Sequence, residues 1–237
     1  SSSDPMRLTH HNDHCGAHFQ NAVPSRTRKV NEPMKAHRLV LAAALCLAAS
    51  AHAQTAAKSE LEAVQRAVHV CAACHGDNGR SSKKLVPSLA GQMREYTIRQ
   101  LKDFRSQSRA ETDIQAYMWG ISALLNDETI EGLADYYLQQ PPAPPKSRNA
   151  RLEADGRKIF ENGIDDKKVR ACSSCHGNDA EGEAGFPRLA GLDAGYVVNQ
   201  MRAFRTPLRK HGVIMKNETR ALTDAQMRAV AAYVQSR

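Results

Sequence analysis

Apolar residues recur at helical spacing in two stretches of the chain that lie about 100 residues apart. The positions are Tyr96, Ile98, Leu101 and Phe104 in the first stretch and Tyr196, Val197, Met201 and Phe204 in the second. Because such spacing puts apolar side chains on one face of a helix, it predicts a helix in each stretch. No alternating apolar and polar run between turn signals predicts a strand. The pattern therefore favours an all-α protein.

Start signals predict a further helix in each half of the chain. Asn126 and Thr223 are residue types that cap helix N-termini, and an aspartate follows each of them. Apolar residues at helical spacing come next: Ile130, Leu133 and Tyr137 after the first cap, and Met227, Val230 and Val234 after the second.

The two halves are copies of one repeat. The segment 71–76, Cys-Ala-Ala-Cys-His-Gly, returns as Cys-Ser-Ser-Cys-His-Gly at 172–177, and Pro-Ser-Leu-Ala-Gly at 87–91 returns as Pro-Arg-Leu-Ala-Gly at 187–191. Tyr96, Gln100, Phe104 and Arg105 recur 100 residues later, and Met118, Leu125, Asp127 and Tyr136 recur 97 residues later. Two similar domains follow from this repeat.

A proline-rich stretch, 139–145, separates the copies. Its prolines remove backbone donors and favour an extended, semi-rigid chain, so we expect an interdomain linker at 141–150. The domains then comprise residues 54–140 and 151–237, 87 residues each. In domains of this size a buried prosthetic group would add usefully to the core.

The N-terminal part has the layout of a secretory signal peptide. Met34 is followed by Lys35 and Arg38, by the apolar run 39–49 and by Ala-His-Ala at 51–53. We expect residues 34–53 to be removed and residues 1–33 to be absent from the mature protein, although the histidines and Cys15 of that upstream segment also resemble metal ligands. The run of 11 apolar residues is too short to span a bilayer. We therefore expect a periplasmic protein of a Gram-negative bacterium without a membrane span.

The positive charge of the chain does not point to nucleic acid. The formal charge of the full sequence is +8, and from Gln54 onward 27 Lys and Arg against 22 Asp and Glu leave +5. No arginine-rich run or basic stripe with interleaved aromatics is present.

The two Cys-x-x-Cys-His segments are haem attachment motifs. Two thiols on one turn, Cys71 with Cys74 and Cys172 with Cys175, add to the haem vinyl groups, and His75 or His176 reaches the iron. A single zinc ribbon needs its cysteine pairs about 15 to 20 residues apart, whereas Cys74 and Cys172 are 98 apart. A redox dithiol or a pair of disulfides would also use paired cysteines. The sequence thus predicts two covalently bound haems c.

Met118 and Met215 are the candidates for the second axial ligand of each iron. They occupy equivalent places, eight residues before Asn126 and Thr223. Methionines in a small helical domain also serve to fill the core. His211, four residues before Met215, is a rival ligand of the second haem or a surface residue, and His69 is expected on a helix face.

These motifs resemble the dihaem class I cytochromes c of the cytochrome c4 type over residues 60–237. The resemblance implies two tandem class I cytochrome c domains, and it implies that the carbonyls of Pro87 and Pro187 accept hydrogen bonds from the ligating histidines. The family packs its first helix against the last. Gly156 and Phe160 fit that contact in the second domain, whereas Ala63 and Val64 suggest a looser crossing in the first.

Electron transfer is the expected function, because iron with both axial positions filled offers substrate no coordination site. The protein itself is then not an enzyme. The resemblance implies a donor complex or dehydrogenase and an oxidase-like acceptor, so membrane association would come only through these partners. Two competing hypotheses are a haem enzyme or enzyme subunit, peroxidase-like or sulfur-oxidising, with one open haem, and a protein in which haem is structural.

The second domain is the more basic and is therefore the expected dock for an acidic partner. Residues 151–237 contain 15 Lys and Arg against 11 Asp and Glu, and residues 54–140 contain 10 against 11. We expect Arg202, Arg205 and Arg209 to carry this docking.

Overall fold

The structure is a computed structural model that describes residues 33–110 and 115–237. It contains these helices: α1 (Pro33–His75), α2 (Arg94–Arg105), α3 (Gln115–Ala123), α4 (Asp127–Leu138), α5 (Ala150–Asn162), α6 (Ser173–His176), α7 (Ala194–Phe204), α8 (Val213–Thr219) and α9 (Asp224–Gln235), with 3-10 turns at Asp77–Gly79 and Asp165–Lys167. The described residues form no strand beyond isolated bridges. The all-α prediction is confirmed.

The chain divides into two units, residues 1–49 and 50–237. Of the expected upstream segment 1–33, residues 1–32 lie outside the described residues, and the expected signal peptide 34–53 falls within α1. No described helix is long and apolar enough to cross a membrane. Removal of the signal peptide stays a prediction.

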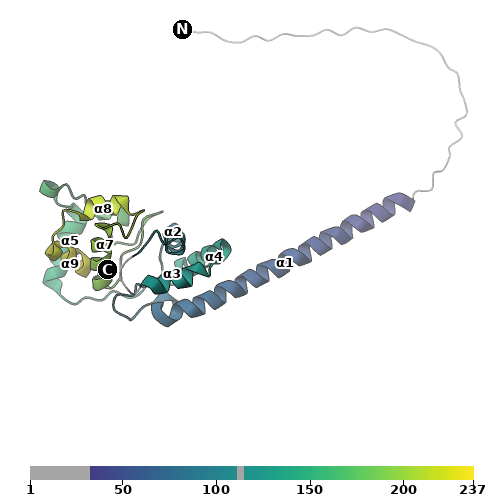
Figure 1. Cartoon of the computed structure of the whole chain (residues 1–237), viewed down its shortest axis with the longest axis horizontal. Coiled ribbons are helices and arrows are strands. Elements are labelled where there is room, and N and C mark those ends of the chain that lie inside the picture. The colour runs from purple at the N-terminus through teal and green to yellow at the C-terminus, as the bar shows by residue number, and fades with distance from the viewer. Residues whose placement is uncertain (1–32, 111–114) are drawn as a thin grey trace, which may run out of the picture. The chain divides into compact units, whose positions relative to one another are not determined.

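Within residues 50–237 the helices form two groups that follow the sequence repeat (Figure 1). The first domain comprises the C-terminal end of α1 and helices α2 to α4, in which α2 contacts both α3 and α4. The second domain comprises α5 to α9, in which α9 contacts α5 and α7, and α7 contacts α8.

The predicted caps are confirmed. The Asn126 side-chain oxygen accepts a hydrogen bond from the Thr129 amide at 2.9 Å. Thr223 and Gln226 exchange side-chain and backbone hydrogen bonds at 3.2 and 2.8 Å, which is a capping box. Each capped helix begins where the sequence indicated, at Asp127 and at Asp224.

The second domain closes where α5 crosses α9. Phe160 is fully buried, and its ring centroid lies 5.2 Å from that of Tyr233. The helices approach closely because position 156 is glycine: a Cβ there would overlap the carbonyl oxygen of Ala229. This backbone contact is the crossing that the resemblance implied.

The first domain makes the equivalent crossing with a different residue pair. Here the glycine is Gly132 on α4, and a Cβ on it would overlap the side chain of Val64 on α1. A valine side chain thus separates the two backbones, whereas in the second domain the glycine meets backbone directly. The small core around it contains Val64, Leu133 and Tyr137. That the first crossing is looser stays a prediction.

The proline-rich linker packs against the domains. The Arg80 guanidinium donates to the carbonyl of Pro141 at 2.8 Å, and Ala143 is buried. On the other side, Lys146 and Gln235 exchange two hydrogen bonds, at 2.9 and 3.0 Å. The linker is therefore held at several points along its length.

Replacing Gly156 by alanine is expected to destabilise the second domain, by about 1 to 3 kcal/mol, because the added methyl group has no room against Ala229. Gly120→Ala on α3 is the matched control: its Cβ meets nothing within 4 Å, so better helix propensity should leave stability equal or slightly higher. Thermal unfolding followed by circular dichroism measures both. Equal melting temperatures for the two variants would contradict the close crossing.

Candidate functional site

Both cysteine motifs end a helix at a sharp turn. Cys71, Cys74 and His75 lie on the last turns of α1, and the second motif forms α6. The glycines that follow have positive φ, +78° at Gly76 and +80° at Gly177. A Cβ at Gly76 would also overlap the carbonyl of Arg80, so the chain reverses there in a way open only to glycine.

The motif histidines are buried and point their Nδ1 atoms at proline carbonyls. His75 Nδ1 lies 2.8 Å from the Pro87 oxygen, and His176 Nδ1 lies 2.9 Å from the Pro187 oxygen. Because a carbonyl only accepts, each Nδ1 carries the hydrogen and donates it. The Nε2 atom then keeps its lone pair, which is the form that ligates a metal. The contacts implied by the resemblance are present.

Burial keeps both imidazoles neutral. His75 is 8% exposed and His176 is 4% exposed. Burial is the main cause that lowers the pKa of each ring, and the positive charge of Arg109 lowers the pKa of His75 further. A neutral ring with one fixed N–H fits the proximal ligand of a haem iron.

All four motif cysteines are free thiols. Burial raises the pKa of the Cys71 thiol and raises that of Cys172 to about 11, so both are protonated at neutral pH. Across residues 33–110 and 115–237, no group of three or more His, Cys, Asp or Glu side chains assembles as a metal cage. Paired thiols beside a neutral histidine fit covalent haem attachment.

The two candidate methionines occupy equivalent helices. Met118 lies on α3 and Met215 on α8, and both are half-buried. By contrast, Met201 and Met227 are buried in the core of the second domain, so they are the core-filling methionines. Ligation of iron by Met118 and Met215 stays a prediction.

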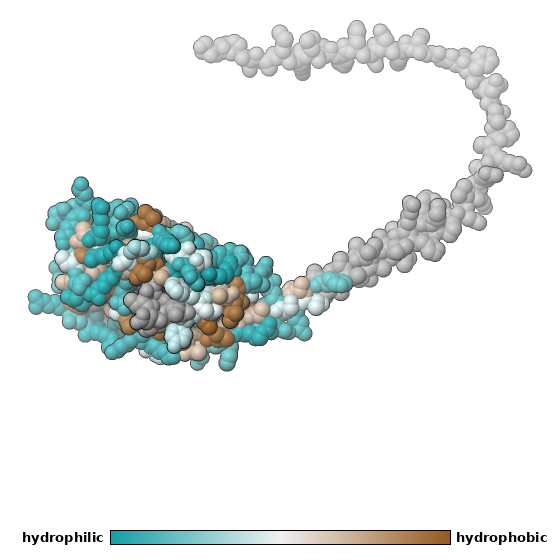
Figure 2. All heavy atoms as spheres, viewed as in Figure 1, coloured by the Kyte–Doolittle hydropathy of each residue, from teal (hydrophilic) through white to brown (hydrophobic). Residues whose placement is uncertain are grey.

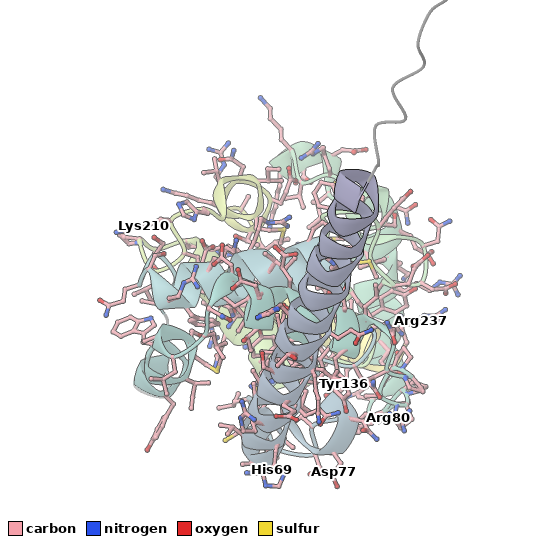
Figure 3. All side chains as sticks on the ribbon, turned by 90° about the vertical axis from the view of Figure 1, so that its right-hand side faces the viewer. His69, Asp77, Arg80, Tyr136, Lys210 and Arg237 are labelled. Carbon is pink, nitrogen blue, oxygen red and sulfur yellow. The ribbon has the colours of Figure 1, made fainter. Side chains whose placement is uncertain are left out.

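The rival histidines are surface residues. His211 is exposed, and its Nδ1 lies 2.7 Å from a carboxylate oxygen of Asp103 in the first domain. His69 is exposed on α1 and points away from the neighbouring helices (Figure 3). Both positions match the surface interpretation of these residues.

A buried polar network joins the two domains. Arg109 and Arg209 pair as an antiparallel bridge, and both side chains are buried. Arg109 donates to Gln200 at 3.0 Å, and Arg209 donates to Gln100 at 2.6 Å. Each arginine also lies over a phenylalanine ring of its own domain, at 4.4 Å for Phe104 and 4.1 Å for Phe204. The repeat thus builds a nearly symmetric contact between its copies.

A second cross-domain contact uses a glutamine. Gln92 accepts from the Arg188 amide at 2.8 Å and donates to the Arg188 carbonyl at 3.0 Å. The residue after the proline that holds His176 is thereby fixed to the first domain. Gln92 was not predicted from the sequence, because the repeat gives no signal there: its equivalent in the second copy is Leu192.

The prediction that Arg202, Arg205 and Arg209 form a docking surface is wrong for two of the three residues. Arg209 is buried in the interdomain network, and Arg205 donates to the carbonyls of Thr219 and Leu222 within its own domain. Only Arg202 is exposed, and it pairs with Asp224 at 2.7 Å. The signal was available, because Arg109 and Arg209 also recur at an offset of 100.

Comparison with known proteins places these features in one family. The family model described as "Cytochrome c" matches residues 61–140 and 153–237. Cytochrome c-552 of Acidithiobacillus ferridurans is 35% identical over 83% of this chain and 86% of its own length. A thiosulfate dehydrogenase electron acceptor of Thiomonas intermedia is 32% identical over 69% of this chain and 76% of its own length.

A solved structure is similar in fold. The crystal structure of reduced recombinant cytochrome c4 from Pseudomonas stutzeri matches with a TM-score of 0.67 and 31% sequence identity. The match covers 74% of this chain and 97% of that one. The likeness therefore extends over both copies of the repeat.

Replacing Cys71 and Cys74 by alanine is expected to halve the covalently bound haem, because only the thioether bonds survive denaturation. Haem staining after denaturing electrophoresis, normalised to protein, measures the change. Ser173→Ala with Ser174→Ala, between the cysteines of the second motif, is the matched control and should keep the full stain. Unchanged staining of the cysteine variant would refute covalent haem attachment at Cys71 and Cys74.

Proposed function

The chain belongs to the cytochrome c family, and on this premise we propose that it is a dihaem electron carrier with one haem c in each domain. The first haem is held by Cys71, Cys74 and His75. The second is held by Cys172, Cys175 and His176. One observation carries the proposal: each motif presents a buried, neutral histidine whose Nδ1 donates to a proline carbonyl.

The bound haem supplies an iron centre that accepts and releases one electron. The chain's own residues hold and shield it. The carbonyls of Pro87 and Pro187 fix the orientation of the two imidazoles and make each ring a stronger electron donor. Because each ring is held in this orientation, dissociation of either histidine from the iron is disfavoured.

Met118 and Met215 complete the axial positions in this proposal. Their equivalent places on α3 and α8 support the assignment, as does the burial of Met201 and Met227 in the core. With both positions filled, the protein carries electrons and leaves catalysis to its partners.

The interdomain contact supports transfer within one molecule. The linked guanidinium and amide groups of Arg109, Arg209, Gln100 and Gln200 lie between the domains, and the linker is hydrogen-bonded to both. A fixed contact keeps the two sites at one separation. One domain then receives an electron from a donor while the other delivers it to an acceptor.

We place the carrier in the periplasm, exported by the signal peptide 34–53. Its donor is a quinol-oxidising complex or a dehydrogenase, and its acceptor is an oxidase of the respiratory chain. The similarity to the cytochrome c4 proteins supports an electron-transfer role for the whole length of both domains. Any association with a membrane comes through these partners.

A thiosulfate dehydrogenase is a second candidate donor. The name of the Thiomonas intermedia relative, a thiosulfate dehydrogenase electron acceptor, favours it. Oxidation of two thiosulfates to one tetrathionate releases two electrons, which equals the capacity of two haems.

Met215→Ala is expected to remove one of two near-infrared bands of the ferric protein and to lower the reduction potential of that haem, because thioether ligation favours ferrous iron. Met227→Leu, a core substitution of similar volume, is the control and should keep both bands. Near-infrared magnetic circular dichroism measures the bands. Two bands in Met215→Ala would point to another donor at the second iron.

Thiosulfate alone is expected to leave the ferric holoprotein oxidised. Addition of a purified thiosulfate dehydrogenase should reduce both haems if that donor is used. The absorbance of the ferrous haem and the amount of tetrathionate measure the two steps. Tetrathionate formed without the dehydrogenase would make the protein itself the enzyme and would overturn its assignment as a carrier.

A further inference from the structure

Helix α8 exposes two large apolar side chains directly before Met215. Val213 is 62% exposed and Ile214 is 52% exposed. The visible surface of residues 50–237 is mainly hydrophilic, with hydrophobic residues in small patches (Figure 2). Large apolar side chains exposed in this way on a short helix lose nothing by contact with a partner and gain by being removed from water.

Exposed cations surround these two residues. Lys216 and Arg220 follow Val213 at helical spacings of three and seven, so they lie on the same face of the helix. Lys210 precedes the helix and points outward (Figure 3). Among the ion pairs of the described residues, none involves Lys210, Lys216 or Arg220.

The acidic residue of α8, Glu218, is already paired with an arginine of its own domain. Glu218 accepts three hydrogen bonds from Arg170, at 2.7, 2.8 and 3.1 Å. His211 is likewise engaged with Asp103. The charges left to face a partner from this helix and the loop before it are therefore positive.

The segment of the first domain that is equivalent to residues 213–220 has no such charge. Residues 115–126 contain no charged side chain. Tyr117 is 76% exposed and Leu124 is 84% exposed. The two domains thus share an apolar position next to the candidate methionine and differ in the charge around it.

We propose that the α8 face, defined as Lys210, Val213, Ile214, Lys216 and Arg220, docks an acidic redox protein that exchanges one electron with the second domain. This inference rests on the proposed electron-carrier function and names the partner chemistry of one of its two domains. It replaces the expectation that Arg202, Arg205 and Arg209 form the dock.

Charge and apolar contact have separate roles on this face. The cations raise the rate of encounter with an acidic surface, an effect that salt screens. Val213 and Ile214 supply the desolvated centre of the contact, whose contribution depends little on salt. Substitutions of the two groups should therefore differ in their salt dependence.

Reduced plant-type ferredoxin, a small acidic iron–sulfur protein, is the probe. It loses one electron and a ferric haem gains it, which stopped-flow absorbance follows without oxygen. In Lys210→Glu with Lys216→Glu, we expect the second-order rate constant at low ionic strength to fall about tenfold and its salt dependence to flatten. In Ile214→Ser, we expect a lower rate constant with the original salt dependence.

Arg151→Glu with Lys158→Glu on α5 is the matched control, because it makes the same charge change at exposed positions of the same domain. Its rate constant should stay within about twofold of the unchanged protein. An equal fall of the rate constant in both double variants, or no fall in either, would overturn the proposal that the α8 face is the docking surface. Dithionite, a reductant strong enough for any haem c, tests the function separately: failure to reduce the haems of the unchanged protein would refute the electron carrier itself.

Discussion

The hydrogen bond from each motif histidine to a proline carbonyl is the interaction on which both sites depend. It joins the end of the cysteine helix to a turn 11 or 12 residues later. That turn is anchored in the same way in both copies, because Gly91 donates to the Tyr137 carbonyl at 2.8 Å and Gly191 to that of Val234 at 2.9 Å. The motif helix, the turn and the last helix of each domain therefore form one connected framework around the imidazole.

The second constraint is that the two frameworks are fixed to each other. Burying the guanidinium groups of Arg109 and Arg209 removes two charges from water, which is costly unless oxygen acceptors replace the lost hydration. Gln100 and Gln200 provide such acceptors across the domain boundary, so each domain completes the solvation of the other's arginine. Because these hydrogen bonds are lost when the domains separate, they favour the docked arrangement of the two domains.

Features that local chemistry determines could be predicted from the sequence. The caps at Asn126 and Thr223, the helices and the tandem repeat depend on neighbouring residues and are confirmed. The burial of Arg209 was not predicted: its recurrence with Arg109 was the one signal, whereas an arginine normally lies at the surface and one of its two glutamine acceptors, Gln100, belongs to the other domain. The role of Gly132 was also not predicted. The repeat preserves the crossing of the first and last helices, but the glycine lies on the last helix, α4, in the first domain and on the first helix, α5, in the second. Iron ligation by the methionines stays a prediction that only the holoprotein tests.

The central claim is that each domain holds one haem whose iron keeps two protein ligands in both oxidation states. Anaerobic spectroelectrochemical titration of the purified holoprotein, with the electrons counted per chain and paramagnetic spectra taken along it, tests this most directly. We expect two reversible one-electron steps per chain and only low-spin signals in the ferric protein. A single electron per chain, or a high-spin ferric signal at either haem, would contradict the claim.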